Sequence, residues 1–203
     1  MTNTITINGQ NIAITEEQFA QLQAALGLKQ KLLAEAEIGS IVTIAGIEWI
    51  VLEHFNGRET LCLTKDFICV RKFDDCTNNY AESEIRKYLN GEFLEKLAYA
   101  VNDDRIVSAK INLTPDDGLD DYGFVCDKVG LLTDTMYRKH NRTIRKYSVK
   151  NWWWTATPYS TKANGYYYSV RCVNGSGTLI DDFCALSCGV RPFCIFKSCI
   201  SVF

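Results

Sequence analysis

The chain has 203 residues, of which 47% are apolar and 23% charged, and its formal net charge is −2. This composition is typical of a folded protein with a proper core, and it excludes an intrinsically disordered chain. The near-neutral charge predicts no general attraction to nucleic acid or to anionic membranes.

Three features of the sequence bear on where the protein is made. No run of 18 apolar residues occurs, so we expect no membrane insertion. Residues 1–6 carry neither a basic nor an apolar signal region, so we expect no signal peptide and synthesis in the cytoplasm. The nine cysteines are then expected to be reduced. The sequence leaves open whether the protein associates with a virion.

Residues 1–37 have the pattern of a separate N-terminal segment. Alternating apolar residues on both sides of an Asn-Gly pair predict a β-hairpin. Thr15 and Gln18 have the spacing of a capping box, and the apolar stripe that follows predicts a helix down to about Glu37. Two interpretations fit this segment: it packs on the main body, or it joins copies of the chain in a homo-oligomer or attaches them to a particle.

Residues 38–203 are predicted to form an α+β domain in which two main helices interrupt an antiparallel sheet. Strands are expected near residues 41–44, 47–52, 60–63, 106–107, 129–132, 152–156, 166–173, 178–180 and 190–196. One helical stretch spans about residues 83–97 with Ser83 as its N-cap, and Thr133 is expected to cap a short helix.

The last quarter of the chain has an unusual vocabulary. It opens with Trp152, Trp153 and Trp154. Residues 163–189 then lack Lys, Glu, Gln, Trp and Met, although these five types make up 35 of the 203 residues. An apolar frame around a polar and aromatic segment is typical of a binding surface, and the segment holds no obvious catalytic set.

Strand geometry makes specific predictions for the aromatic residues. Alternation places Trp153 opposite Trp152 and Trp154, and Tyr167 opposite its neighbours within 166–168. The tryptophans either pack in the core on at least one face or form an aromatic platform for a sugar or a peptide.

A series of motifs carries a resemblance to a known family. The motifs are, in order, Ile85–Phe93, Leu131–Thr133, Trp152–Pro158, Val173–Gly177 and Gly189–Pro192. This series resembles a phage- and bacterium-encoded domain family of C-type lectin fold, distantly akin to formylglycine-generating enzyme, that includes the variable proteins of diversity-generating retroelements. The resemblance covers about residues 38–203, with a variable region at about 152–192. Where the family usually has Leu-Arg-Ser-Pro this chain has Thr155 to Pro158, so no role for that arginine is carried over.

The resemblance implies a non-catalytic protein that binds a protein ligand or a cell-surface receptor through a diversified surface. Reverse transcription that randomises the adenines of Asn codons cannot yield Lys, Glu, Gln, Trp or Met, which matches residues 163–189. The implied ligand-binding residues are Tyr159, Asn164, Tyr167, Arg171, Ile180, Asp182, Phe183, Ala185, Leu186 and Cys188. Leu179 and Ser187 occupy positions that the family holds steady. Two alternatives stay open: a binding domain that is not diversified, and an oxidising enzyme.

Little in the sequence supports a catalytic site or a metal site. The cysteines at 184, 188, 194 and 199 form no CxxC pair and have no histidine nearby in sequence, so we expect no zinc site and no cofactor. The enzyme alternative would need a reactive pair among Cys172, Cys184 and Cys188, but nothing in the sequence lowers the pKa of a thiol there.

Two charged segments are predicted to be solvated loops. The acidic residues 116–121 lack the ligand spacing of an EF-hand. Residues 137–150 carry six basic side chains and no acidic one, which suits either a grip on a phosphate backbone or a connecting loop that the carboxylates of residues 116–127 partly neutralise. We favour the loop and expect no nucleic-acid partner.

Overall fold

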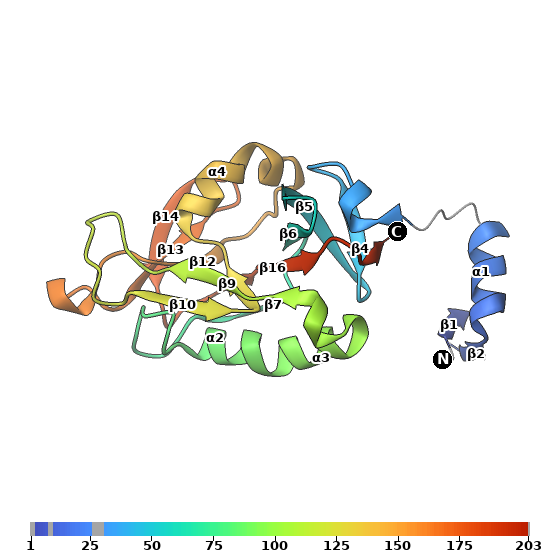
Figure 1. Ribbon diagram of the computed structural model, residues 1–203. Coiled ribbons are helices and arrows are strands. Elements are labelled where there is room, and N and C mark those ends of the chain that lie inside the picture. The colour runs from blue at the N-terminus through green and yellow to red at the C-terminus, as the bar shows by residue number, and fades with distance from the viewer. Residues whose placement is uncertain (1–2, 8–9, 26–30, 203) are drawn as a thin grey trace.

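The computed structural model describes residues 3–7, 10–25 and 31–202, and it has a mixed α+β architecture in which strands hold more residues than helices (Figure 1). Its two largest sheets have six and five strands. The prediction of an α+β class is therefore confirmed. No helix in the described ranges is long and apolar enough to span a membrane.

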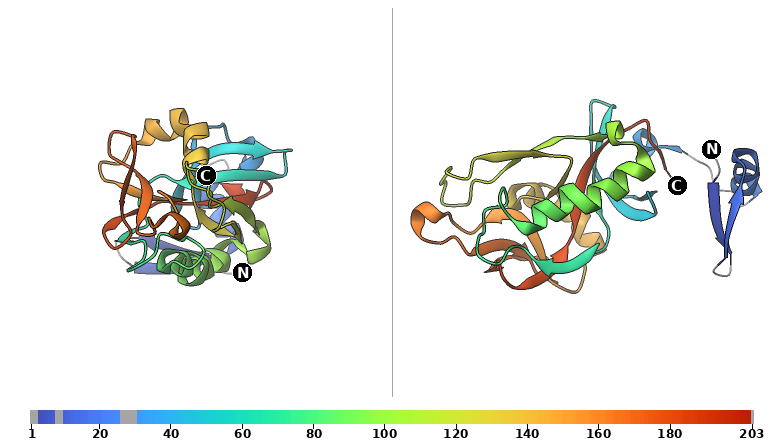
Figure 2. Two further views of the ribbon diagram at one scale, coloured as in Figure 1. Left: turned by 90° about the vertical axis from the view of Figure 1, so that its left-hand side faces the viewer. Right: turned by 90° about the horizontal axis from the view of Figure 1, so that it is seen from below.

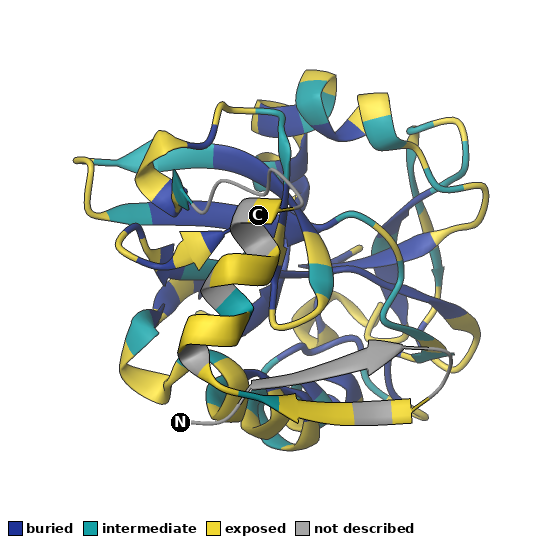
Figure 3. Cartoon of the chain, turned by 90° about the vertical axis from the view of Figure 1, so that its right-hand side faces the viewer, coloured by how far each residue is buried: buried dark blue, intermediate teal, exposed yellow. Residues whose placement is uncertain are grey.

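The N-terminal hairpin and helix form as predicted. The elements are β1 (Asn3–Ile7), β2 (Gln10–Ile14) and α1 (Glu16–Ala25). The backbone N–H of Thr15 donates to Gln18 Oε1 at 2.9 Å, and the backbone N–H of Gln18 donates to Thr15 Oγ1 at 3.2 Å, so the capping box is confirmed. The predicted Asn-Gly turn at residues 8–9 lies outside the described ranges. Figure 3 shows most of α1 in the exposed class.

The prediction that this helix continues to about Glu37 is wrong. Lys31–Leu32 is a strand, β3, that pairs antiparallel with β17 (Ser201–Val202) near the C-terminus. The backbone N–H of Leu33 then donates to the carbonyl of Ile200 at 2.8 Å, and the Leu33 side chain is fully buried. Leu33, one of the apolar residues that suggested a helical stripe, therefore closes the core of the body, so residues 31–37 belong with the body.

The larger sheet holds much of the core. Its path is β11-β16-β6-β5-β4, with β8 beside β16. The strands are β4 (Ile41–Ile44), β5 (Ile47–Phe55), β6 (Glu59–Thr64), β8 (Ile106–Val107), β11 (Val129–Leu131) and β16 (Pro192–Lys197). Ala45 and Gly46 join β4 to β5 with φ values of 54° and 74°, the positive angles that a two-residue type I′ hairpin turn requires.

The second sheet positions the C-terminal region. Its order is β14-β13-β12-β15-β7. The strands are β7 (Cys69–Lys72), β12 (Trp153–Pro158), β13 (Ser169–Val173), β14 (Leu179–Phe183) and β15 (Ser187–Val190). β12 pairs parallel with β15 and antiparallel with β13. Every residue of this central strand is buried.

That central position corrects the prediction for the tryptophans. Trp153 packs against Tyr137 with ring centroids 5.7 Å apart, and Trp154 packs against Phe73 at 5.8 Å. Both faces of β12 are covered, so both indoles are buried, and they lie on opposite faces as alternation requires. Trp152 precedes the strand and is 43% exposed, so the predicted strand start at Trp152 is wrong, whereas the predicted core packing on at least one face is confirmed by Trp153 and Trp154.

Helices cover the sheets on two sides. α2 (Glu84–Tyr88) and α3 (Leu94–Val101) lie along the lower side in Figure 1, whereas α4 (Asp134–Ile144) lies on the upper side; Figure 2 shows α2 and α3 from below. The hydroxyls of Ser83 and Thr133 accept hydrogen bonds from the third backbone N–H beyond them, so both predicted N-caps are confirmed.

The basic segment is a helix for half of its length, which corrects the prediction of a loop. Tyr137, His140 and Ile144 repeat at helical spacing and are buried, while the six basic side chains of residues 137–150 are exposed. Arg138 pairs with Asp116 at 3.3 Å, so one carboxylate of the 116–127 segment does neutralise this surface as predicted. The acidic residues 116–121 form a loop between β9 (Ala109–Asn112) and β10 (Phe124–Asp127), also as predicted.

Candidate ligand-binding surface

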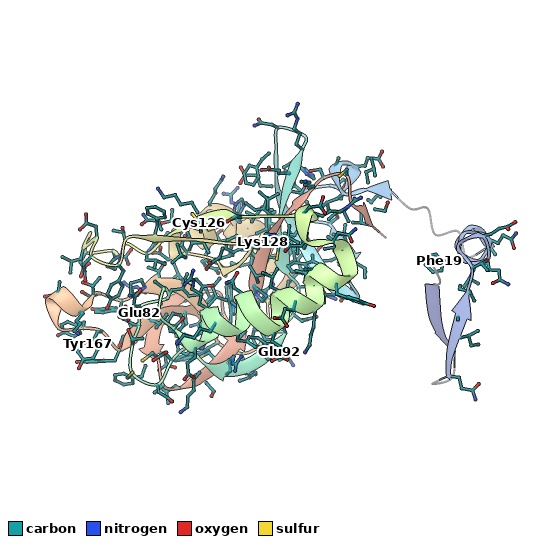
Figure 4. The ribbon with its side chains drawn as sticks, turned by 60° about the horizontal axis from the view of Figure 1, so that its bottom comes forward. Phe19, Glu82, Glu92, Cys126, Lys128 and Tyr167 are labelled. Carbon is teal, nitrogen blue, oxygen red and sulfur yellow. The ribbon has the colours of Figure 1, made fainter. Side chains whose placement is uncertain are left out.

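A cluster of exposed apolar side chains lies at one end of the body. We call it the aromatic rim: Tyr159, Tyr166, Tyr167, Tyr168, Phe183 and Leu186, each between 39% and 57% exposed. Ring centroids are 6.0 Å apart for Tyr159 and Tyr166, and 5.1 Å apart for Tyr167 and Tyr168. Figure 4 shows Tyr167 at the end of the body that lies away from the N-terminal segment. An exposed aromatic cluster of this kind marks an interaction surface more often than a monomer's ordinary exterior.

Residues 159–168, which we call the rim loop, do not form a strand. This corrects the prediction that a strand begins at residue 166. Strand β13 begins only at Ser169, and all three tyrosines of residues 166–168 are exposed, so none of them has a buried face. The backbone of this loop is held instead by a side chain from another part of the chain.

That side chain is Asn78, which is fully buried. Its Nδ2 lies 2.8 Å, 2.9 Å and 2.8 Å from the carbonyl oxygens of Ser160, Tyr166 and Ser169. The backbone N–H of Asn78 also donates to the carbonyl of Tyr167 at 2.7 Å. One amide therefore fixes both ends and the tip of the loop.

Two further residues, Tyr122 and Cys184, also hold the backbone of this loop. The hydroxyl of Tyr122 donates to Asn78 Oδ1 at 2.9 Å and accepts the backbone N–H of Lys162 at 3.0 Å. The backbone N–H of Cys184 donates to the carbonyl of Tyr168 at 2.7 Å, which ties the turn after β14 to the rim loop. Within the described chain, none of the four rim tyrosine hydroxyls makes a hydrogen bond. The rim backbone is thus held by groups other than the rim side chains.

Arg171 connects the rim to the acidic loop. Its guanidinium carbon lies 4.9 Å from the centroid of the Tyr159 ring, and its Nη2 lies 2.7 Å from Asp116 Oδ2. Its Nη1 is 4.0 Å from Asp181 Oδ1. Arg171 was predicted to contact ligand, but these partners give it a bracing role within the protein.

The other predicted site residues divide by burial. Tyr159, Asn164, Tyr167, Phe183, Ala185 and Leu186 are exposed, whereas Arg171, Ile180 and Asp182 are partly buried. Cys188 is only 5% exposed and lies on β15, in the interior of the second sheet, so little of its side chain is accessible, and its contact with ligand stays a prediction. Ser187, expected to belong to the steady frame, is exposed.

Sequence reasoning missed several residues of this end of the molecule. Trp152 and Val70 are 43% and 60% exposed beside Asp182 and line a hollow of about 250 Å³ with it. Trp152 was expected to share a strand face with Trp154, and Val70 lies far from the C-terminal motifs in sequence. No signal in the sequence links Val70 to this end, because β7 joins the sheet only through its pairing with β15.

The buried cysteines do not offer a thiolate. Burial raises the pKa of Cys184 to about 11 and that of Cys188 to about 12, and it raises the pKa of Cys172 further. These thiols are therefore protonated near neutral pH, which opposes nucleophilic or redox chemistry at this place. Among the described residues, no group of three or more His, Cys, Asp or Glu side chains is placed to hold a metal ion.

Comparison with known proteins gives one match. A family model described as a domain of unknown function (DUF6273) matches residues 123–198, which run from β10 to β16 and include the whole rim. No curated protein and no solved structure matches the chain.

Proposed function

We propose that this protein is a non-catalytic ligand-binding protein of C-type lectin fold, and that it binds a protein ligand or a cell-surface receptor through the aromatic rim. The observation that carries the proposal is that the rim side chains are exposed, while other groups hold the rim backbone in place. Asn78 and Tyr122 supply the holding contacts from outside the rim. Tyrosine and phenylalanine on such a fixed backbone offer a large contact area at a low entropy cost.

We further propose that the rim is diversified by a retroelement. Most rim side chains lie within residues 163–189, the segment whose vocabulary fits adenine randomisation. Because the loop needs its backbone groups and not its side chains, substitutions at the rim should change stability little. A surface that tolerates change in this way suits diversification.

The motifs behind the resemblance have physical roles that support the fold proposal. A Cβ added at Gly175 would lie 2.4 Å from the backbone oxygen of Lys150, so no larger residue fits there. A Cβ at Gly189 would lie 2.5 Å from the Phe67 ring. Trp153 and Trp154 fill both sides of the central strand. These contacts explain why a scaffold of this kind would keep such residues while its rim varies.

Binding by the rim is tested with a double variant. Labelled wild-type protein and Phe183→Ser/Leu186→Asn are compared by flow cytometry on a panel of bacterial strains. We expect wild type to bind at least one strain and the double variant to lose that binding, because exposed apolar anchors dominate interface energy. Both proteins should have the same circular dichroism spectrum and melting temperature.

Arg142→Gln/Lys150→Gln is the matched control, since it changes two exposed basic side chains of α4 and the segment after it and should alter the association rate at most. Retained binding by the rim variant, or complete loss in the control, moves the site elsewhere. Diversification has its own test in the genome: a near-copy of the 3′ coding segment that differs only at adenines, beside a reverse transcriptase gene. Absence of that repeat removes the retroelement and leaves a static binding domain.

A further inference from the structure

A hollow of about 250 Å³ opens beside the rim, between the start of β12 and strands β14 and β15. We call it the Trp152 hollow; its lining includes Val70, Asn151, Trp152, Asp182, Ser187 and Cys188. The backbone N–H of Gly189 donates to the carbonyl of Trp152 at 2.8 Å, which fixes the position of Trp152 at its edge.

Two walls of the hollow, Trp152 and Val70, are exposed apolar side chains that the core does not use, and the rest of the lining is largely polar. The other three tryptophans are at least 98% buried, and the indole N–H groups of Trp49 and Trp154 donate to backbone carbonyls. The Trp152 indole is 43% exposed and makes no hydrogen bond in the described part of the chain. Val70, which is 60% exposed, adds an aliphatic wall. An aliphatic side chain beside an indole offers apolar surface on which a methylene chain can pack, and the indole face attracts a cation.

Asp182 brings a negative charge to this apolar surface. Its Oδ1 accepts the backbone N–H of Phe183 at 2.9 Å, which fixes the carboxylate, and its Oδ2 lies 3.9 Å from Cys188 Sγ. Across residues 3–7, 10–25 and 31–202, no cationic group lies within ion-pair distance of this carboxylate.

Charged residues on the neighbouring strands are engaged elsewhere, and Arg71, which faces Cys188, lies over the Tyr88 ring at 4.1 Å. Asp181 lies on the opposite face of β14 and approaches Arg171. Lys72, which faces Ser187 across the β7–β15 pair, is bonded to Asp75 at 2.7 Å. The hollow therefore keeps an unmatched negative charge beside an aromatic face.

We propose that the Trp152 hollow binds a basic side chain, lysine or arginine, of the protein ligand. Its methylene stem lies on Trp152 and Val70, and its cationic head is held by the Asp182 carboxylate and the indole face. This inference rests on the proposed function, and it narrows the ligand to a protein that presents a basic side chain next to an apolar patch that meets the rim.

The residues that line the hollow come from both the constant and the variable parts of the chain. Trp152 and Val70 lie outside residues 163–189, whereas Asp182 lies within them. Diversification would then keep the Trp152 and Val70 walls and act on the lining residues within 163–189, which include Asp182 and Cys188. The preference for a basic side chain would depend on position 182, because an uncharged residue there leaves the cation without its partner.

The test uses the full chain, labelled with ¹⁵N, and two small probes: N-acetyl-lysine methylamide and its norleucine analogue, which has a methylene chain but no charge. Loss of one indole signal in Trp152→Phe assigns the Trp152 N–H resonance. We expect lysine to shift that resonance with about tenfold higher affinity than norleucine, the combined effect of a cation–π contact and a partly exposed ion pair. The shift should weaken as salt is added.

Asp182→Asn keeps the side-chain volume and the acceptor for the Phe183 N–H, so it should fold, and it should bring the affinity for lysine down to that for norleucine. Asp181→Asn, on the other face of the same strand, should bind lysine as wild type does. Equal affinity for the two probes, no shift with either, or an unchanged lysine affinity in Asp182→Asn overturns the proposal. If any of these occurs while the rim variant still loses cell binding, the inference about the hollow fails and the proposed function stands.

Discussion

At the scale of single residues, the backbone of the binding surface depends on a buried amide that lies outside that surface. Asn78 contacts the carbonyls of Ser160, Tyr166 and Ser169, and it does so from a segment that shows no unusual composition. A buried carbonyl oxygen that loses its hydrogen-bond donor has already given up its contacts with water. It then makes no hydrogen bond in the folded state, which costs free energy. The loop conformation therefore depends on a residue that sequence reasoning gave no reason to single out.

Replacement of Asn78 by alanine should show this dependence. Because an unpaired buried polar group costs about 1–3 kcal/mol, we expect Asn78→Ala to lower the free energy of unfolding by about 3 kcal/mol in urea denaturation. The amides of residues 160–169 should also exchange faster with solvent. Asn164→Ala removes an exposed amide from the same loop and should change the stability by less than about 0.5 kcal/mol. Equal effects of the two substitutions would contradict the role of Asn78.

At the scale of elements, local signals were reliable and long-range ones were not. The capping box at Thr15 and the N-caps at Ser83 and Thr133 depend on residues three apart, and all three formed as predicted. The extension of the first helix failed because Leu33 is used by a pairing with the distant C-terminus. The predicted strand start at Trp152 failed for a similar reason, since the start of β12 at Trp153 is set by its neighbours in the sheet.

The binding surface was predictable only in part. Phe183 and Leu186 were among the implied ligand-binding residues, and both are exposed, with Phe183 as the last residue of strand β14. Tyr166 and Tyr168 were assigned to a strand, because three apolar aromatics before Ser169 look like one in sequence. Contacts from residues distant in sequence, including Asn78, which lies 88 residues before Tyr166, hold that segment in an irregular conformation.

A prediction at this scale concerns α4 and its contact with β5. His140 is buried on α4, and its Nε2 lies 3.4 Å from Glu53 Oε2. Burial lowers the pKa of His140, against the opposing effect of Glu53, so the folded state takes up a proton at lower pH than the unfolded state does. Stability from this group is present above the unfolded pKa of about 6.5 and is lost as the pH falls through the lower folded pKa.

We therefore expect the free energy of unfolding to fall more steeply on acidification below about pH 6.5 in wild type than in His140→Gln. Urea denaturation across that range measures the difference, and NMR titration of the imidazole should report a pKa below that of free histidine. A parallel pH dependence in the two proteins would show that His140 does not carry the effect.

At the scale of the whole molecule, the two ends of the body differ in character. The rim lies at one end, and the strands β3 and β17, through which the N-terminal segment joins, lie toward the other, near the C-terminus in Figure 1. Ile12 and Leu22 of the N-terminal segment are 42% and 37% exposed. An association through this segment would leave every rim free, which suits the interpretation of residues 1–37 as a homo-oligomer contact.

Deletion of residues 1–29 tests that interpretation. The described core contains no residue before Leu33, so the melting temperature of the shortened chain should stay close to that of the full chain. If the segment joins copies, light scattering after size-exclusion chromatography should give an oligomer for the full chain and a monomer for the shortened one. Cell binding should weaken by about 10²–10⁴-fold, because simultaneous engagement of several rims is lost. A full chain that is already monomeric would instead favour the other interpretation, in which the segment packs on its own body.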